Sequence, residues 1–272
     1  MNLLAIVDQD VVHDDINIGS DASITITSFG GLSICINDQC AGVQAWKSPK
    51  VYQLLLVIVA LGGRNVSVVS ICDLLWPDND GDKAMQNFEF MLRRLRQVLK
   101  SKFGGLLRGR QSVMMHHGKV SLNADVFSLD SWRWEALSSQ ARRLRIKEQW
   151  ESAFELEQLA MRLLSGPFLQ GDHDKILMQR DVWHTRTCNW IHDTVGNWLQ
   201  DVEISHGQVM DLLDRGLLID PCSEKLCMQR MNILLDNGYK VDAMRVYKNW
   251  VTLVKSTLGM SPFTQEFQPP AN

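Results

Sequence analysis

Membrane and export signals are the first features that the sequence lacks. Its longest strongly apolar stretch, 52–62, is shorter than the roughly 20 residues that a membrane-spanning helix needs. Residues 1–12 have neither the basic start nor the small-residue cleavage site of a secretory signal. We therefore expect a cytoplasmic protein with no membrane partner.

Motifs of the common enzyme classes are missing too. The patterns G-x-x-x-x-G-K-[ST], G-x-S-x-G and H-E-x-x-H do not occur, so nucleotide hydrolysis and the usual hydrolase chemistries have no support. No cysteine pair has the C-x-x-C spacing of metal and redox sites. We expect no enzyme, no cofactor and no metal, and we interpret the scattered cysteines as reduced thiols, mostly in the core. They are Cys35, Cys40, Cys72, Cys188, Cys222 and Cys227.

One constellation remains as an enzyme alternative. His184, Cys188 and His192 follow at steps of four on a predicted helix, a spacing that can present metal ligands on one face. The face drifts by about 40° at each step of four, however, and tryptophans typical of packing interrupt it. We therefore favour packing over a zinc site.

The chain is long enough for two ordinary domains, because 272 residues with 45% hydrophobic content can bury a substantial core. In the first half, apolar residues alternate with small or polar ones over 23–36, with Gly30-Gly31 between, which predicts a β-hairpin or a short meander. Pro49 and Gly62-Gly63 bound a buried helix, and Ser67 is the predicted N-cap of a second helix that ends at Trp76-Pro77.

A third helix is predicted over 83–100, where apolar residues form one stripe that must face the core. Beyond it, 106–110 and 113–122 predict a second hairpin, with a turn at His117-Gly118. Together the sheet, three helices and hairpin predict a winged helix-turn-helix. The stripe consists of Met85, Phe88, Leu92, Leu95 and Leu99.

The second half has the pattern of helices only, separated by Gly- or Pro-containing breaks. Within it, 216–254 loosely resembles a tetratricopeptide unit, whose period is about 34 residues. The fold class expected is therefore an α+β winged helix-turn-helix domain followed by an all-α, tetratricopeptide-like helical domain. The helices are predicted over 150–164, 178–206, 209–218, 224–235 and 241–258, and the tryptophans predicted as core are Trp183, Trp190, Trp198 and Trp250.

The outward face of the helix 83–100 is the candidate functional site. Three cations on it suit DNA phosphates, amide side chains suit base edges in a major groove, and an exposed aromatic suits a thymine methyl group. Cations of the second hairpin would reach the neighbouring backbone or the minor groove. The phosphate contacts are Lys83, Arg93 and Arg94, the base contacts are Gln86, Asn87, Gln97 and Phe90, and the hairpin contacts are Arg108, Arg110 and Lys119.

Two observations weigh against this site. A surface helix often has several arginines for solubility alone, and the net charge of −3 excludes a broadly basic surface. Glu89 lies four residues before Arg93, so an intrahelical pair worth on the order of 0.3 kcal/mol can partly mute the positive face. We expect this pair to tune binding rather than abolish it.

Motifs in both halves resemble the SARP regulators, in which an OmpR-type winged helix precedes a bacterial transcriptional activation domain. The resemblance spans about 24–262 and departs from the family at 89–91, where many relatives have small polar or basic residues. The residues that support it are Leu75-Trp76-Pro77-Asp78, Gly81-Asp82, Leu92-Arg93-Arg94-Leu95-Arg96, Leu99 and the hairpin 107–122, followed by Gly166-Pro167-Phe168-Leu169, Asp220-Pro221, Glu224, Gly238, Ala243, Tyr247, Leu258-Gly259 and Pro262.

The resemblance implies that 83–100 is the recognition helix and that the hairpin is the wing. It also implies a homodimer that binds direct promoter repeats in double-stranded DNA and contacts RNA polymerase as an activator. The alternative function is a helical-repeat interaction scaffold without DNA binding. The predicted division is a 1–22 extension, a 23–125 winged helix expected to fold without the residues after Arg145, a 126–145 linker, a 146–264 activation domain and a 265–272 tail.

Overall fold

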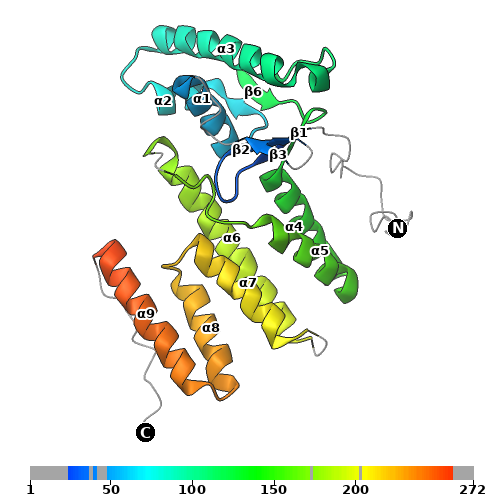
Figure 1. The fold of residues 1–272 in the computed structure, drawn as a ribbon, viewed down its shortest axis with the longest axis vertical. Helices are drawn as coiled ribbons and strands as arrows, with labels where there is room; N and C mark the ends of the chain where they lie inside the picture. The colour runs from blue at the N-terminus through cyan, green and yellow to red at the C-terminus, as the bar shows by residue number, and fades with distance from the viewer. Residues whose placement is uncertain (1–23, 37–38, 42–47, 172–173, 202–203, 260–272) are drawn as a thin grey trace.

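The N-terminal sheet has four strands in the order β3-β2-β1-β7. The computed structural model describes residues 24–36, 39–41, 48–171, 174–201 and 204–259 (Figure 1). The predicted first hairpin is confirmed, because β1 and β2 pair antiparallel on either side of the Gly30-Gly31 turn. The predicted 1–22 extension and 265–272 tail lie outside the described residues. The strands are β1 Ile24–Thr27, β2 Ser33–Ile36, β3 Gln39–Ala41 and β7 Phe127–Leu129.

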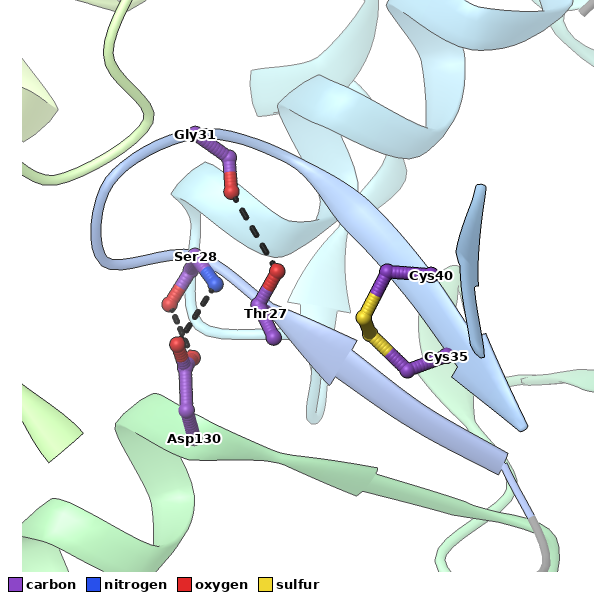
Figure 2. The surroundings of a disulfide bond; sticks show 6 residues. All are labelled: Thr27, Ser28, Gly31, Cys35, Cys40 and Asp130. Atoms are coloured by element: carbon purple, nitrogen blue, oxygen red, sulfur yellow. Dashed lines mark hydrogen bonds between the residues drawn. A yellow bond between two sulfur atoms is a disulfide. The ribbon is translucent and has the colours of Figure 1, made fainter. Parts of the chain in front are cut away.

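Two cysteines of this sheet form a disulfide, so the prediction of six reduced thiols was wrong for Cys35 and Cys40 (Figure 2). The antiparallel register of β2 and β3 places these two residues directly opposite each other. Side chains at such opposed positions lie close together, and sequence spacing alone does not reveal the register. The other four cysteines are free, and three of them are buried as predicted.

The prediction of a linker over 126–145 was also wrong, because these residues form a strand and a helix. Its first residues form β7, which pairs in parallel with β1, placing Ile24 beside Phe127 and Ile26 beside Leu129. Helix α4, Asp130–Ile146, follows β7 without an intervening residue. The strand β7, which lies beyond the predicted end of the first domain at 125, therefore completes the first sheet. The basic stretch 142–145 belongs to the last turn of α4.

Three helices follow the sheet as predicted. The Ser67 side chain accepts a hydrogen bond from the backbone N–H of Ser70 at 3.5 Å, which confirms this residue as the N-cap of α2. The third helix is longer than predicted and ends at Leu107, with Arg108 as its C-cap in the left-handed region at φ 47°. Its extra turns exist because Phe103 and Leu107 continue the buried stripe. The helices are α1 Pro49–Ala60, α2 Val68–Leu75 and α3 Gly81–Leu107.

A second sheet, in the order β4-β6-β5, contains the wing. Its hairpin turns at His117 and Gly118, whose φ angles of 47° and 70° match the two-residue turn that hairpin twist favours. The hairpin begins at Val113, so the prediction that 106–110 forms one of its strands was wrong. Helix α3 continues past its predicted end at Lys100 and through Gly104-Gly105. The strands are β4 Val66–Ser67, β5 Val113–His116 and β6 Lys119–Leu122.

The rest of the described chain is helical, which confirms the predicted fold class. The helix predicted over 178–206 ends earlier, at Trp198, and the next helix, predicted over 209–218, begins earlier, where Ser205 forms a capping box with Gln208 at the start of α7. Trp183 and Trp250 are buried and Trp190 is half-buried. The elements are α4, α5 Trp150–Leu163, the short 3-10 helix η3 Asp174–Ile176, α6 Leu177–Trp198, α7 His206–Ile219, α8 Glu224–Asp236 and α9 Lys240–Leu258.

One apolar core runs from the winged helix into the helical region. Phe29, in the β1–β2 turn, contacts Phe168 and Trp183 edge to face, with ring centroids 5.8 Å apart in both pairs. Lys175 Nζ donates to the carbonyl oxygens of Leu74 and Leu75 at the end of α2, at 3.1 and 3.3 Å. These contacts hold the two regions against each other.

Asp130, the first residue of α4, forms a second set of contacts between the winged helix and the helical region. Its carboxylate accepts from the Ser28 N–H at 2.7 Å and the Ser28 hydroxyl at 2.5 Å (Figure 2). It also accepts from the Phe29 N–H at 3.0 Å. The Ser131 N–H donates to it as well, at 2.7 Å. Burial raises the pKa of Asp130, while these donors act in the opposite direction. The β1–β2 turn is thereby fixed to the start of α4.

A buried ion pair links the next three helices. Arg145 at the end of α4 donates to both carboxylate oxygens of Glu157 in α5, at 3.0 and 2.6 Å. The indole N–H of Trp198 in α6 donates to the same carboxylate at 2.6 Å. The Arg145 and Glu157 side chains are only 10% and 3% exposed. The predicted linker residue Arg145 is therefore a packing partner rather than a solvated charge.

Candidate nucleic-acid interface

The exposed face of α3 contains the side chains predicted to contact DNA. The opposite stripe holds the helix against the core, where Phe88, Leu92, Leu95 and Leu99 are at most 3% exposed; the fifth predicted member, Met85, is half-buried. This packing turns the polar residues outward, as the helical period requires. The exposed residues are Lys83, Gln86, Phe90, Arg93, Arg94 and Gln97, whereas Asn87 is half-buried.

Local contacts order part of this face. Phe90 is 52% exposed, and the guanidinium carbon of Arg94 lies 5.4 Å from the centroid of its ring. Such a cation over an aromatic face is mutually attractive. Arg93 Nε donates to the backbone oxygen of Glu89 at 3.4 Å, and none of the ion pairs between described residues includes Glu89. Arg93 therefore forms no ion pair with the neighbour that was predicted to mute its charge.

The remaining predicted contacts lie at two places. Lys119 is exposed at the start of β6, beside the tip of the wing. Arg108 and Arg110, predicted on the hairpin, lie instead in the turn between α3 and β5, where Arg110 Nη1 donates to the backbone oxygen of Asp125 at 3.1 Å. Both are exposed, so the turn adds cations at the far end of α3.

Sequence reasoning missed Arg96 and Lys100, which join Arg110 around a hollow of about 200 Å³ at this end of α3. Arg96 Nε donates to the backbone oxygen of Val113 at 2.9 Å, which turns the side chain toward the wing. Burial lowers the pKa of Arg96. Three cations around one hollow suit an anion such as a phosphate. The helical period could have found Lys100, which continues the side of α3 on which Arg93 lies.

The residues of the zinc alternative lie in a packed environment. Cys188 is buried, and burial together with the nearby Asp220 raises its pKa to about 12. Burial lowers the pKa of His184. Across the described ranges, no three His, Cys, Asp or Glu side chains are placed to hold a metal ion.

Within the same ranges, no helix is both long and apolar enough to cross a membrane.

The overall architecture is similar to that of a solved structure. A solved structure of Mycobacterium tuberculosis EmbR, in complex with a low affinity phosphopeptide, matches 89% of this chain with a TM-score of 0.55 and 18% sequence identity. At that identity the match shows the fold alone, and the chain spans 62% of the length of the EmbR chain. No curated protein matches.

The family comparison covers the helical half. A model described as bacterial transcriptional activator domain matches residues 129–266, about half of the chain. The match begins at Leu129, the last residue of β7, and so includes α4 through α9. Together with the winged helix-turn-helix in front of it, this match means that the chain belongs to the bacterial transcriptional activator domain family and is a SARP-type transcriptional regulator.

Proposed function

We propose that this regulator binds double-stranded DNA through α3 and activates transcription by contacting RNA polymerase. The observation that supports DNA binding is the exposed face of α3, where three cations surround amide side chains and a half-exposed phenylalanine. Cations aimed at phosphates fix the position of a protein on the duplex, and amides and apolar groups distinguish base edges. The protein acts as a homodimer on direct repeats, in the cytoplasm, and without catalysis.

The face divides its roles between affinity and sequence reading. Arg94 contacts a phosphate, so Arg94→Ala should weaken binding to preferred and random duplexes alike and flatten the plot of log affinity against log salt by about one unit. Gln86 and Phe90 contact bases. Gln86→Ala or Phe90→Ala should cost roughly 1 to 3 kcal/mol on the preferred site and far less on random DNA, with an almost unchanged salt slope.

The experiment begins by selecting the preferred duplex from a random pool with the full chain. Labelled preferred and random duplexes are then titrated at several salt concentrations with each variant. Arg143→Ala is the matched control, because Arg143 is an exposed cation of α4 outside the proposed face. If all three α3 variants bind like the parent while remaining folded, α3 does not bind DNA, and the scaffold function takes precedence.

Activation has its own test. Transcription in vitro from a promoter that contains the selected repeats should rise when the full chain is added to purified RNA polymerase. The α3 variants should lose this effect in proportion to their loss of promoter binding. A protein that occupies the repeats without changing transcription would contradict the activator role but leave DNA binding in place.

A further inference from the structure

Helix α9 has one face in the core and an opposite face that no described element covers. Trp250 and Val254 turn inward and pack with Cys227 and Met231 of α8 in a small cluster of their own. On the outer side, a shallow hollow of about 460 Å³ runs along the helix. Its lining residues are Lys240, Val241, Met244, Arg245, Lys248 and Asn249.

The outer face combines positive charge with apolar surface. Lys240, Lys248 and Lys255 project from the same side of α9 at helical spacing, and all three are exposed. The one carboxylate of the helix, Asp242, is paired with Arg245 at 2.9 Å. This cationic stretch belongs to a chain whose net charge is −3. The end of the helical domain is therefore locally positive, although the whole molecule has a negative net charge.

Apolar side chains lie within this cationic surface. Val241 is 73% exposed, and Met244 lines the hollow one helical turn later. An exposed aliphatic side chain bordered by lysines matches a ligand that brings both apolar groups and carboxylates. A surface that runs along a helix and has no sheet edge suits a second helix laid beside it.

We propose that this outer face of α9 binds an acidic amphipathic helix of a partner protein. Apolar residues of that helix fill the hollow over Val241 and Met244, and its glutamates or aspartates pair with Lys240 and Lys248. The partner takes the place where the next helix of a stacked helical array would pack. The proposal does not depend on DNA binding by α3.

The position of the face is consistent with an adaptor role. Figure 1 shows α3 at one end of the long axis of the molecule and α9 at the other. A partner on α9 would therefore leave the proposed DNA-binding face open. Residues 260–272 follow α9 in sequence and contain a single acidic side chain, Glu266, so charge favours a separate acidic partner over this segment.

The probe is a designed peptide helix with leucines at i, i+3, i+4 and i+7 spacing and glutamates elsewhere, with a fluorescent label. The full chain should bind it at least about tenfold more tightly than a scrambled peptide of the same composition. Lys248→Glu should weaken binding by about tenfold, and Val241→Ser by about fivefold. Both side chains are exposed, so the variants should unfold at the same urea concentration as the parent.

Lys147→Glu is the matched control, since it makes the same charge change at an exposed position beyond the end of α4 and should leave binding within about twofold of the parent. Equal binding of the scrambled peptide, or equal loss in Lys147→Glu and Lys248→Glu, would overturn the proposal. So would tighter binding of a peptide with the sequence 260–272. A loss of random duplex DNA binding in Lys248→Glu, with peptide binding unchanged, would assign the face to nucleic acid instead.

Discussion

Replacing Glu157 by glutamine should destabilise the protein severely although the side chain keeps its shape. The carboxylate is 3% exposed and accepts from both the Arg145 guanidinium and the Trp198 indole N–H. Removing one partner of a buried ion pair leaves an uncompensated charge, which typically costs about 3 to 5 kcal/mol. Glutamine places an amide N–H group, a donor, at one of the two oxygen positions, so one of the Arg145 or Trp198 donors loses its acceptor. We expect Glu157→Gln to lose about 3 to 5 kcal/mol of unfolding free energy.

The double variant Arg145→Met with Glu157→Leu separates the charge from the packing. It removes both ions, and apolar residues of similar volume commonly replace a buried pair at little cost. The Trp198 N–H would still lose its acceptor, which costs about 1 to 3 kcal/mol. The double variant should therefore be more stable than Glu157→Gln, an order that a simple count of lost hydrogen bonds would reverse.

Urea denaturation of the full chain, followed by tryptophan fluorescence and circular dichroism, measures these differences. Asp242→Asn is the control, since the Asp242–Arg245 pair is 50% and 68% exposed and should be worth less than about 1 kcal/mol. A Glu157→Gln protein within about 1 kcal/mol of the parent would refute the reasoning, because a buried guanidinium without its counter-ion cannot be that inexpensive.

Four further outcomes are expected. Asp130→Asn should cost more than about 2 kcal/mol in urea unfolding, because an amide nitrogen would face backbone donors; a loss below about 0.5 kcal/mol would contradict this. The free energy of unfolding should fall as pH rises from about 9 toward 12, because the Cys188 thiol has a raised pKa in the folded protein and ionises at lower pH in the unfolded chain. Cys188→Ala should make this fall shallower, and an equal slope in the variant and the parent would contradict the expectation. Reducing the Cys35–Cys40 disulfide should lower the free energy of unfolding by no more than about 2 kcal/mol, because the disulfide closes a loop of few residues. The control is a Cys35→Ala/Cys40→Ala protein, whose stability should not respond to reductant. A loss above about 4 kcal/mol on reduction would refute the small-loop argument. A fragment ending at Arg145 should fail to fold stably, contrary to the expectation from sequence, because it lacks the helices that pack on α4; a cooperative unfolding transition of that fragment would contradict this.

Local sequence signals predicted much of the winged helix. Pro49 and Gly62-Gly63 bound α1, and Ser67 caps α2, because caps and breaks act within a few residues of their own position. The strand β7 was missed, since three residues show no periodicity and their partner lies about a hundred positions away. The role of Arg145 was missed for the same reason, because Glu157 completes the pair from another helix.

The candidate site shows the same division. The exposed side of α3 followed directly from the helical period, so Gln86, Phe90 and Arg94 lie on the predicted face. The hollow beside Arg96 did not, because it depends on where α3 ends and where the wing begins. The sequence prediction ended the helix at Lys100. Packing of Phe103 and Leu107 carries α3 further, through Gly104-Gly105, although glycine has poor helix propensity.

The direct passage from β7 into α4 has a consequence for promoter geometry. Leu129 ends a strand of the winged-helix sheet, and Asp130 begins the first helix of the activation domain, so no flexible segment separates the two. With α3 in a groove as proposed, the activation domain would point from the duplex in one fixed direction. Inserting about 5 base pairs between the repeats and the promoter would turn that domain to the opposite side of the DNA, and about 10 would return it to the original side. Activation by this protein should therefore depend on the helical phase of its binding site as well as on distance.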